Sequence, residues 1–134
     1  MLDFLSYDGA YSDVLIRDVF GMPLYIGRRI IFCTRWSKRK IYGAGCDHFL
    51  KIHIGTVLGR SKDMVRNVLV EDSYTKSTYT IVGRRDCCYF DEVLDSPLLE
   101  IKDEFYEDEN GYWKNEDGLE VPEIICFLEN LKCG

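Results

Sequence analysis

The chain has 134 residues, of which 46% are apolar and 13% aromatic, and its formal net charge is −6. This composition favours one folded domain with a hydrophobic core and excludes a disordered chain, and no apolar run approaches the roughly 18 residues that a membrane-spanning helix needs. Residues 1–4 lack the basic and apolar regions of a signal peptide. We therefore expect a cytoplasmic protein without a membrane partner.

Short apolar, β-branched runs separated by glycines and turn residues predict the strands of a small β-barrel. The first strand is expected at residues 14–19 and ends at Gly21-Met22-Pro23, because proline lacks an N–H donor and glycine permits unusual backbone angles. The next is expected at residues 29–34. Residues 35–49 form the longest interval without apolar runs and are predicted to be a loop, of a length that usually binds something or is disordered.

Residues 50–54 alternate strictly between apolar and polar side chains. This pattern predicts a strand with Lys51 and His53 on its polar face. Gly55 is expected to mark a bulge or a sharp bend. Later strands are predicted at residues 65–71 and 74–82, and a short last strand at residues 87–90 closes the set.

This succession of strands, with a long first loop and tight later turns, resembles the SH3-like barrel, particularly its KOW-type variants. The resemblance rests on Asp18-Val19-Phe20-Gly21, Leu24-Tyr25-Ile26-Gly27, Ile30-Ile31-Phe32, Gly55-Thr56-Val57 and Val68-Leu69-Val70-Glu71-Asp72. The order of these motifs also looks like small accessory proteins of tailed bacteriophages. It covers residues 14–91 and departs from the usual Gly-Asp step at Gly27, which Arg28 and Arg29 follow. The resemblance implies an accessory protein that acts in the host cytoplasm on transcription, the nucleoid or defence.

Charge is segregated by sign along the chain. Residues 1–26 carry a net charge of −3, residues 27–85 carry +9 and residues 86–134 carry −12. Such segregation is informative about partners and not about fold.

A basic segment with one tryptophan is the main candidate site. Six of the thirteen residues at positions 28–40 are basic and none is acidic. Arginine and lysine contact phosphates, and tryptophan stacks on a base or sugar. The predicted nucleic-acid-binding residues are Arg28, Arg29, Arg35, Trp36, Lys38, Arg39, Lys40, Arg60, Lys62 and Arg66, and Arg84 and Arg85 extend the patch if the turns fall on one side. The alternative is a solvated loop with Trp36 packed into the barrel.

The segment at residues 103–120 has eight carboxylates against one lysine, with aromatic residues between them. Asn110-Gly111 favours a hairpin, and a partly ordered arm is the alternative. This segment either folds back on the basic patch, or presents carboxylates where a nucleic-acid-binding protein expects phosphates, or is simply a soluble hairpin. Its predicted protein-partner residues are Glu107, Asp108, Glu109, Tyr112 and Trp113.

Pro122 is suited to the first position of a helix, and the apolar stripe that follows predicts a C-terminal α-helix to about residue 131. We therefore divide the chain into an SH3-like β-barrel with an N-terminal extension at residues 1–95, and an acidic hairpin or arm plus this helix, packed on the barrel, at residues 96–134. The predicted fold class is mainly β.

The six cysteines include no CxxC pair, which favours reduced thiols over the alternative of a secreted disulfide framework. Zinc sites usually use pairs of ligands two to four residues apart. Cys46 and His48 are two apart and would share a face of a strand, whereas the adjacent Cys87 and Cys88 would not, so we do not expect a zinc site with His53. The chain has no Gly-rich phosphate loop, GxSxG or HExxH motif. We predict no metal, no cofactor and no catalytic residues.

These features predict a non-enzymatic binding module that contacts nucleic acid, or a nucleic-acid-bound host complex, through a basic barrel face. The alternative is a protein-protein inhibitor of a host nuclease, polymerase or defence protein that docks through residues 103–120.

Overall fold

A computed structural model describes residues 2–7, 9–91, 104–107 and 113–115. Most of its regular structure is one antiparallel sheet in which the main strands follow the order β4-β3-β2-β1-β5. The strands are β1 (Arg29–Arg39), β2 (Cys46–Arg60), β3 (Val68–Asp72), β4 (Thr78–Ile81) and β5 (Cys87–Tyr89), and two short helices are η1 (Gly9–Tyr11) and α1 (Gly83–Asp86). The mainly β prediction is confirmed. Within the described ranges, no helix combines the length and apolarity needed to cross a membrane.

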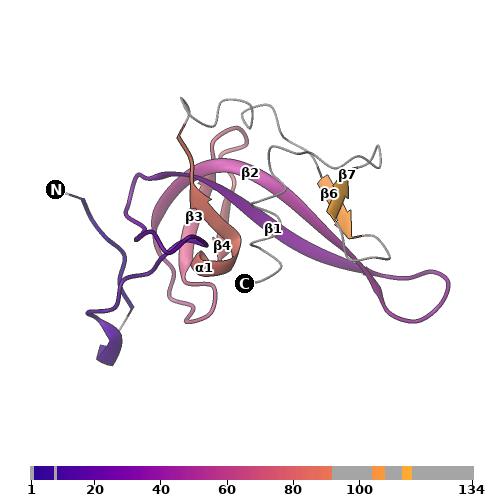
Figure 1. The fold of residues 1–134 in the computed structure, drawn as a ribbon, viewed down its shortest axis with the longest axis horizontal. Coiled ribbons are helices and arrows are strands. Elements are labelled where there is room, and N and C mark those ends of the chain that lie inside the picture. The colour runs from indigo at the N-terminus through magenta and orange to yellow at the C-terminus, as the bar shows by residue number, and fades with distance from the viewer. Residues whose placement is uncertain (1, 8, 92–103, 108–112, 116–134) are drawn as a thin grey trace.

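The sheet is open, not a closed barrel (Figure 1). Strands β4 and β5 are the two ends of its main path, and among the described strands no pairing joins them. The prediction of a closed β-barrel is therefore wrong, whereas the last strand expected at residues 87–90 is present as β5. β5 pairs with β1 at residues 30–32, and the single turn of α1 carries the chain from one end of the sheet to the other.

The hydrophobic core lies where the sheet curves around the first half of β1. Ile30 and Phe32 are fully buried, and so are the neighbouring Ile31 and Cys33, because both faces of β1 are covered here. The other core residues come from the N-terminal segment, the later strands and β5: Leu5, Ile16, Leu24, Val57, Val68, Val70, Ile81 and Cys87.

The N-terminal segment does not form the predicted strand at residues 14–19. It makes isolated bridges instead, among them Ser6 with Leu15 and Arg17 with Pro23. The reason is a tight turn after Asp18, whose buried carboxylate accepts hydrogen bonds from the backbone N–H groups of Phe20 and Met22 at 2.9 and 2.8 Å. A side chain that bonds its own backbone in this way competes with strand pairing.

The predicted bulge at Gly55 is also misplaced. Gly55 pairs regularly with Ile30 of β1 and Asp72 of β3, and the register shift falls between Val57 and Gly59. The glycine is required for close packing, because a Cβ atom here would lie 2.7 Å from Cε1 of Phe32 and still closer to the Glu71 carbonyl oxygen.

The predicted loop at residues 35–49 is mostly strand. β1 and β2 stay paired out to Arg39 and Cys46, and they run beyond the body of the sheet as a long twisted ribbon (Figure 1). Trp36 lies opposite Phe49, and the Ser37 hydroxyl is hydrogen-bonded to Nδ1 of His48 at 2.9 Å. These cross-strand contacts stabilise a strand pair that has little apolar periodicity.

Strands β3 and β4 are shorter than predicted, because aspartate side chains hold the turns before each of them. Oδ1 of Asp63 accepts the N–H of Val65 at 2.7 Å, and Oδ1 of Asp72 accepts the N–H of Tyr74 at 2.8 Å. β3 therefore begins at Val68 rather than at residue 65, and β4 at Thr78 rather than at residue 74.

The acidic region contributes β6 (Glu104–Glu107) and β7 (Trp113–Asn115), which pair antiparallel as the predicted hairpin requires. β6 also pairs with β2, with residues 104–106 opposite residues 49–51. The acidic strand is thus part of the same sheet as the basic ribbon. The hairpin tip and the predicted helix at residues 122–131 lie outside the described residues.

Candidate nucleic-acid interface

The outer half of β1 presents its polar side chains on two faces. Arg35, Ser37 and Arg39 alternate with Trp36 and Lys38, since successive strand residues point to opposite sides of a sheet. On the second face, the ring of Trp36 stacks on Phe49 with centroids 5.5 Å apart and planes inclined by 13°. Nζ of Lys38 lies 5.8 Å from the Phe49 centroid. This face therefore combines aromatic rings with a cation.

A third aromatic residue extends this row onto β6. Tyr106 is directly opposite Phe49 in the β2–β6 pair, and Trp36 is opposite Phe49 in the β1–β2 pair. Residues directly opposite one another in an antiparallel pair share a face. Trp36, Phe49 and Tyr106 thus form an aromatic row across three strands. We call these three residues the aromatic row.

The tip of the ribbon is both basic and apolar. Ile41 and Tyr42 are 88% and 89% exposed, directly after the exposed residues Arg39 and Lys40. The turn is narrow, with a hydrogen bond from the Lys40 N–H to the Gly45 carbonyl at 3.1 Å. The tip therefore offers positive charge and apolar surface to a partner.

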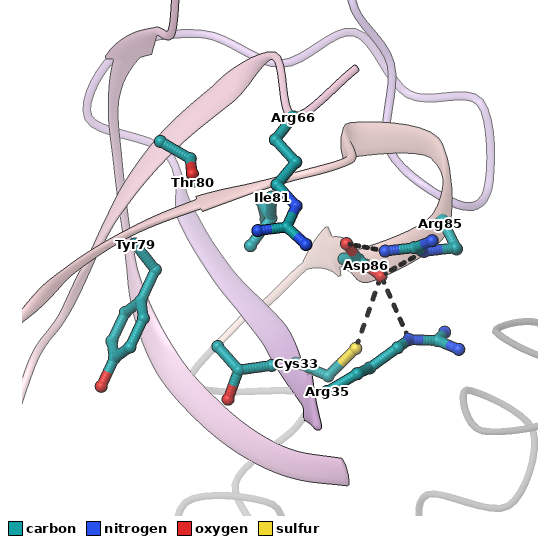
Figure 2. Close-up of a pocket in the computed structure, with 9 residues that line it drawn as sticks. Cys33, Arg35, Arg66, Tyr79, Thr80, Ile81, Arg85 and Asp86 are labelled. Atoms are coloured by element: carbon teal, nitrogen blue, oxygen red, sulfur yellow. Dashed lines mark hydrogen bonds and ion pairs between the residues drawn. The ribbon is translucent and has the colours of Figure 1, made fainter. Parts of the chain in front are cut away.

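A pocket of about 300 Å³ lies beside the ribbon, where β4 faces β1 and α1 (Figure 2). The opening of the sheet creates this space. Three arginines from separate parts of the chain line it: Arg35 from β1, Arg66 from the loop before β3 and Arg85 from α1. We call it the arginine pocket. Two of these residues, Arg35 and Arg66, belong to the predicted site.

Asp86 organises the arginine pocket from its floor. Its buried carboxylate accepts hydrogen bonds from Nε and Nη2 of Arg85 at 2.8 and 3.1 Å, and Nε of Arg35 lies 3.4 Å from the same group. The Val82 N–H and, at 3.8 Å, the Cys33 thiol also donate to it. Asp86 therefore fixes two of the three guanidinium groups in place.

Four of the predicted nucleic-acid-binding residues lie away from the ribbon and the pocket. Arg29 begins β1 and Arg28 precedes it, so about 33 Å of strand, at roughly 3.3 Å per residue, separates Arg29 from Arg39 along the chain. Cζ of Arg28 lies 4.0 Å from the ring centroid of Tyr89. Arg60 and Lys62 lie at and after the far end of β2, and Nη1 of Arg60 donates to the Ser6 carbonyl at 3.3 Å.

His53 is buried, contrary to the prediction of a polar strand face. Its ring stacks on Phe32, and its Nδ1 lies 2.7 Å from Oδ2 of Asp72 and its Nε2 lies 2.8 Å from Oγ1 of Thr34. Burial lowers the pKa of His53, and the hydrogen bond to Asp72 offsets only part of this effect. Burial alone would raise the pKa of Asp72, but hydrogen bonds from His53 and from two backbone N–H groups lower it. Neutral His53 thus links a carboxylate to a hydroxyl that lines the arginine pocket.

This burial makes the stability of the fold depend on pH. The folded state holds His53 at a pKa below its reference value of 6.5, so it binds fewer protons than the unfolded chain, and stability falls as the pH drops below that value. In urea unfolding between about pH 7.5 and pH 5.5, we expect the free energy of unfolding to fall by at most about 1.4 kcal/mol per pH unit, which is the value for the uptake of one proton. His53→Gln should reduce this slope, and His48→Gln, at an exposed site, should not. Equal slopes for the wild type and His53→Gln would contradict the prediction.

The cysteines described by the structure are free, and Cys33, Cys87 and Cys88 are buried. For these three the burial agrees with the prediction of small apolar side chains, whereas Cys46 is exposed. Within residues 2–7, 9–91, 104–107 and 113–115, no group of three or more His, Cys, Asp or Glu side chains is arranged to hold a metal ion. His48 is hydrogen-bonded to Ser37, and His53 to Thr34 and Asp72, so the two histidines have separate partners.

Sequence reasoning missed the role of Asp86, Phe49 and Tyr106, and it mentioned Arg85 only as an extension of the patch. The available signal was the charged run Arg84-Arg85-Asp86 directly before a short apolar strand. Of the predicted protein-partner residues, Glu107 and Trp113 fall in β6 and β7, and Asp108, Glu109 and Tyr112 lie outside the described residues.

Comparison of this chain with models of known protein families, with curated proteins and with solved structures finds no match.

Proposed function

We propose that this protein is a non-enzymatic module that binds nucleic acid through the outer part of the β1–β2 ribbon and the adjoining arginine pocket. The observation that carries the proposal is that Arg35 belongs to both: it lies on the ribbon strand and lines the pocket with Arg66 and Arg85. The paired N–H groups of an arginine guanidinium match the spacing of phosphate oxygens. The exposed residues Lys38, Arg39 and Lys40 extend the positive charge to the tip of the ribbon.

The aromatic row supports single-stranded nucleic acid as the preferred form. Bases stack on aromatic side chains in single strands, and a duplex does not offer its base faces. The row lies on the sheet surface next to Lys38, so cations and rings are available to the same strand. β6 pairs with the edge of the ribbon, at β2. This pairing does not cover either face of the ribbon.

A salt titration tests the proposal. Fluorescence anisotropy with labelled single-stranded and duplex DNA and RNA is expected to show affinity that rises as salt is lowered, highest for single strands. The double variant Arg39→Glu with Lys40→Glu should make the slope of log affinity against log salt shallower by about 0.7 for each phosphate that the protein no longer neutralises. The matched control, Lys62→Glu with Lys76→Glu, reverses the same number of exposed charges away from the ribbon. No measurable binding at about 50 mM salt would reject the proposal, because phosphate contacts are strongest at low salt.

The SH3-like assignment is part of this proposal. Four consecutive antiparallel strands, with the fifth beside the first, support a likeness to the SH3-like strand order in an open sheet. The division at residues 95 and 96, and the likeness to accessory proteins of tailed bacteriophages, stay predictions. The inhibitor hypothesis also stays a prediction, and capture from host lysate that disappears on reversal of Glu107 but persists on reversal of Arg39 and Lys40 would favour it.

A further inference from the structure

The arginine pocket has an unbalanced charge. Three guanidinium groups face one carboxylate, that of Asp86. The buried thiol of Cys33 adds no negative charge at neutral pH, because burial, and then the nearby Asp86, raises its pKa to about 12. The described side chains that line the pocket therefore sum to a charge of +2.

Arg66 is the lining arginine that has no side-chain partner among the described residues. Within the described part of the chain, its guanidinium makes no hydrogen bond and no ion pair, and Asp63 contacts only its backbone N–H, at 3.2 Å. Figure 2 shows the Arg66 side chain reaching down from its loop toward Asp86, between Ile81 and Arg85. It therefore points into the same space as the two arginines that Asp86 holds.

The other two sides of the pocket supply further donors. Arg85 uses Nε and Nη2 on Asp86, which leaves the two N–H bonds of its Nη1 without a described partner. Thr80 lines the pocket from β4 and brings a hydroxyl donor, whereas Thr34 lines it from β1 with its hydroxyl already hydrogen-bonded to Nε2 of His53. N–H and O–H groups that converge on one point are the usual environment of a bound oxyanion.

We propose that the arginine pocket binds a phosphate monoester, with Arg66, Arg85 and Arg35 as its cationic ligands. A monoester carries close to two negative charges at neutral pH, which matches the summed charge of these described side chains, whereas an internal phosphodiester carries one. The volume of about 300 Å³ is at the lower end for ligand pockets and suits a phosphate group with its attached sugar. The group can come from the end of a nucleic-acid strand or from a free nucleotide. The first source rests on the proposed function, and the second does not.

Matched ligands separate the two sources. Single strands of one sequence, with a 5′-phosphate, a 3′-phosphate or hydroxyl groups at both ends, are compared by anisotropy at one salt concentration. Adenosine 5′-monophosphate is compared with adenosine by calorimetry. We expect a phosphorylated end to strengthen strand binding at least about 10-fold, the range of one charge-assisted pair, or the monophosphate to bind where adenosine does not.

Arg66→Gln tests the site itself. Because this side chain is exposed and has no described partner, the variant should fold normally and lose the preference for the phosphorylated ligand. The matched control is Arg84→Gln, an exposed arginine next to Arg85 that does not line the pocket. Equal binding of phosphorylated and unphosphorylated ligands, or equal behaviour of the two variants, overturns this inference. If hydroxyl-ended strands still bind, the proposed function stands without it, and if only the monophosphate binds, the pocket stands and the proposed function fails.

Discussion

Replacing Gly55 with alanine is expected to destabilise the fold by about 3 kcal/mol, the upper end of the usual cost of overpacking. The added methyl group would lie 2.7 Å from Cε1 of Phe32 and closer still to the carbonyl oxygen of Glu71. Neither neighbour can easily give way, because Phe32 is fully buried in the core and Glu71 belongs to the β2–β3 backbone ladder. The strands must separate, and the separation is at the centre of the sheet.

Urea unfolding monitored by circular dichroism measures this loss. Gly59→Ala is the matched control, because Gly59 lies in the same strand and a Cβ atom there meets nothing within 4 Å. We expect the control to change the free energy of unfolding by less than about 1 kcal/mol. Similar losses for both variants would show that close packing is not the reason why position 55 requires a glycine.

Asp18→Ala is expected to be nearly as damaging. The fully buried carboxylate accepts three backbone N–H groups, those of Phe20 and Met22 in its own turn and that of Tyr89 in β5, the last at 3.0 Å. Removing it leaves three partly buried donors without this acceptor, and a fully buried unsatisfied donor costs about 1–3 kcal/mol. We therefore expect a loss of about 3 kcal/mol or more, since Asp18 ties the N-terminal segment to the end of the sheet.

A series of Asp18 variants separates the stabilisation by the hydrogen bonds in the turn from that by the hydrogen bond to β5. Asp18→Asn can keep Oδ1, which accepts both turn N–H groups, but it replaces Oδ2, which accepts the Tyr89 N–H. Its loss in thermal unfolding should be intermediate. Asp13→Ala, at an exposed position, should change stability by no more than about 0.5 kcal/mol. If Asp18→Ala matches Asp13→Ala, the hydrogen bonds of Asp18 do not stabilise the fold.

The apolar runs were sufficient to predict the parts of the sheet that contain the core. The start of β1, the position of β5 and the pairing of the acidic hairpin follow from local composition. The outer half of the ribbon could not be found in this way, because its strands are held by contacts between residues far apart in sequence, such as Trp36 on Phe49. The burial of His53 could not be predicted for the same reason, since its partner Asp72 is in another strand.

The candidate site was predictable in its charge but not in its shape. The clustering of basic residues identified Arg35 and Arg66, and the exposed Arg39 and Lys40. The pocket itself depends on Asp86, which gathers arginines from β1 and α1, and no local pattern indicates that these elements meet. Arg28 and Arg29 were included because they are near in sequence, and a strand of eleven residues moves them to the far end.

The edge of β1 that faces away from β2 affects self-association of the protein. Within the described part of the chain, no strand pairs with β1 beyond Phe32 on the side opposite β2. Such an edge is a template for another copy of the chain, and like charges on it keep copies apart. Lys38 and Arg39 supply these charges. Neutral substitutions there would therefore promote aggregation, whereas reversal to glutamate keeps two edges mutually repulsive.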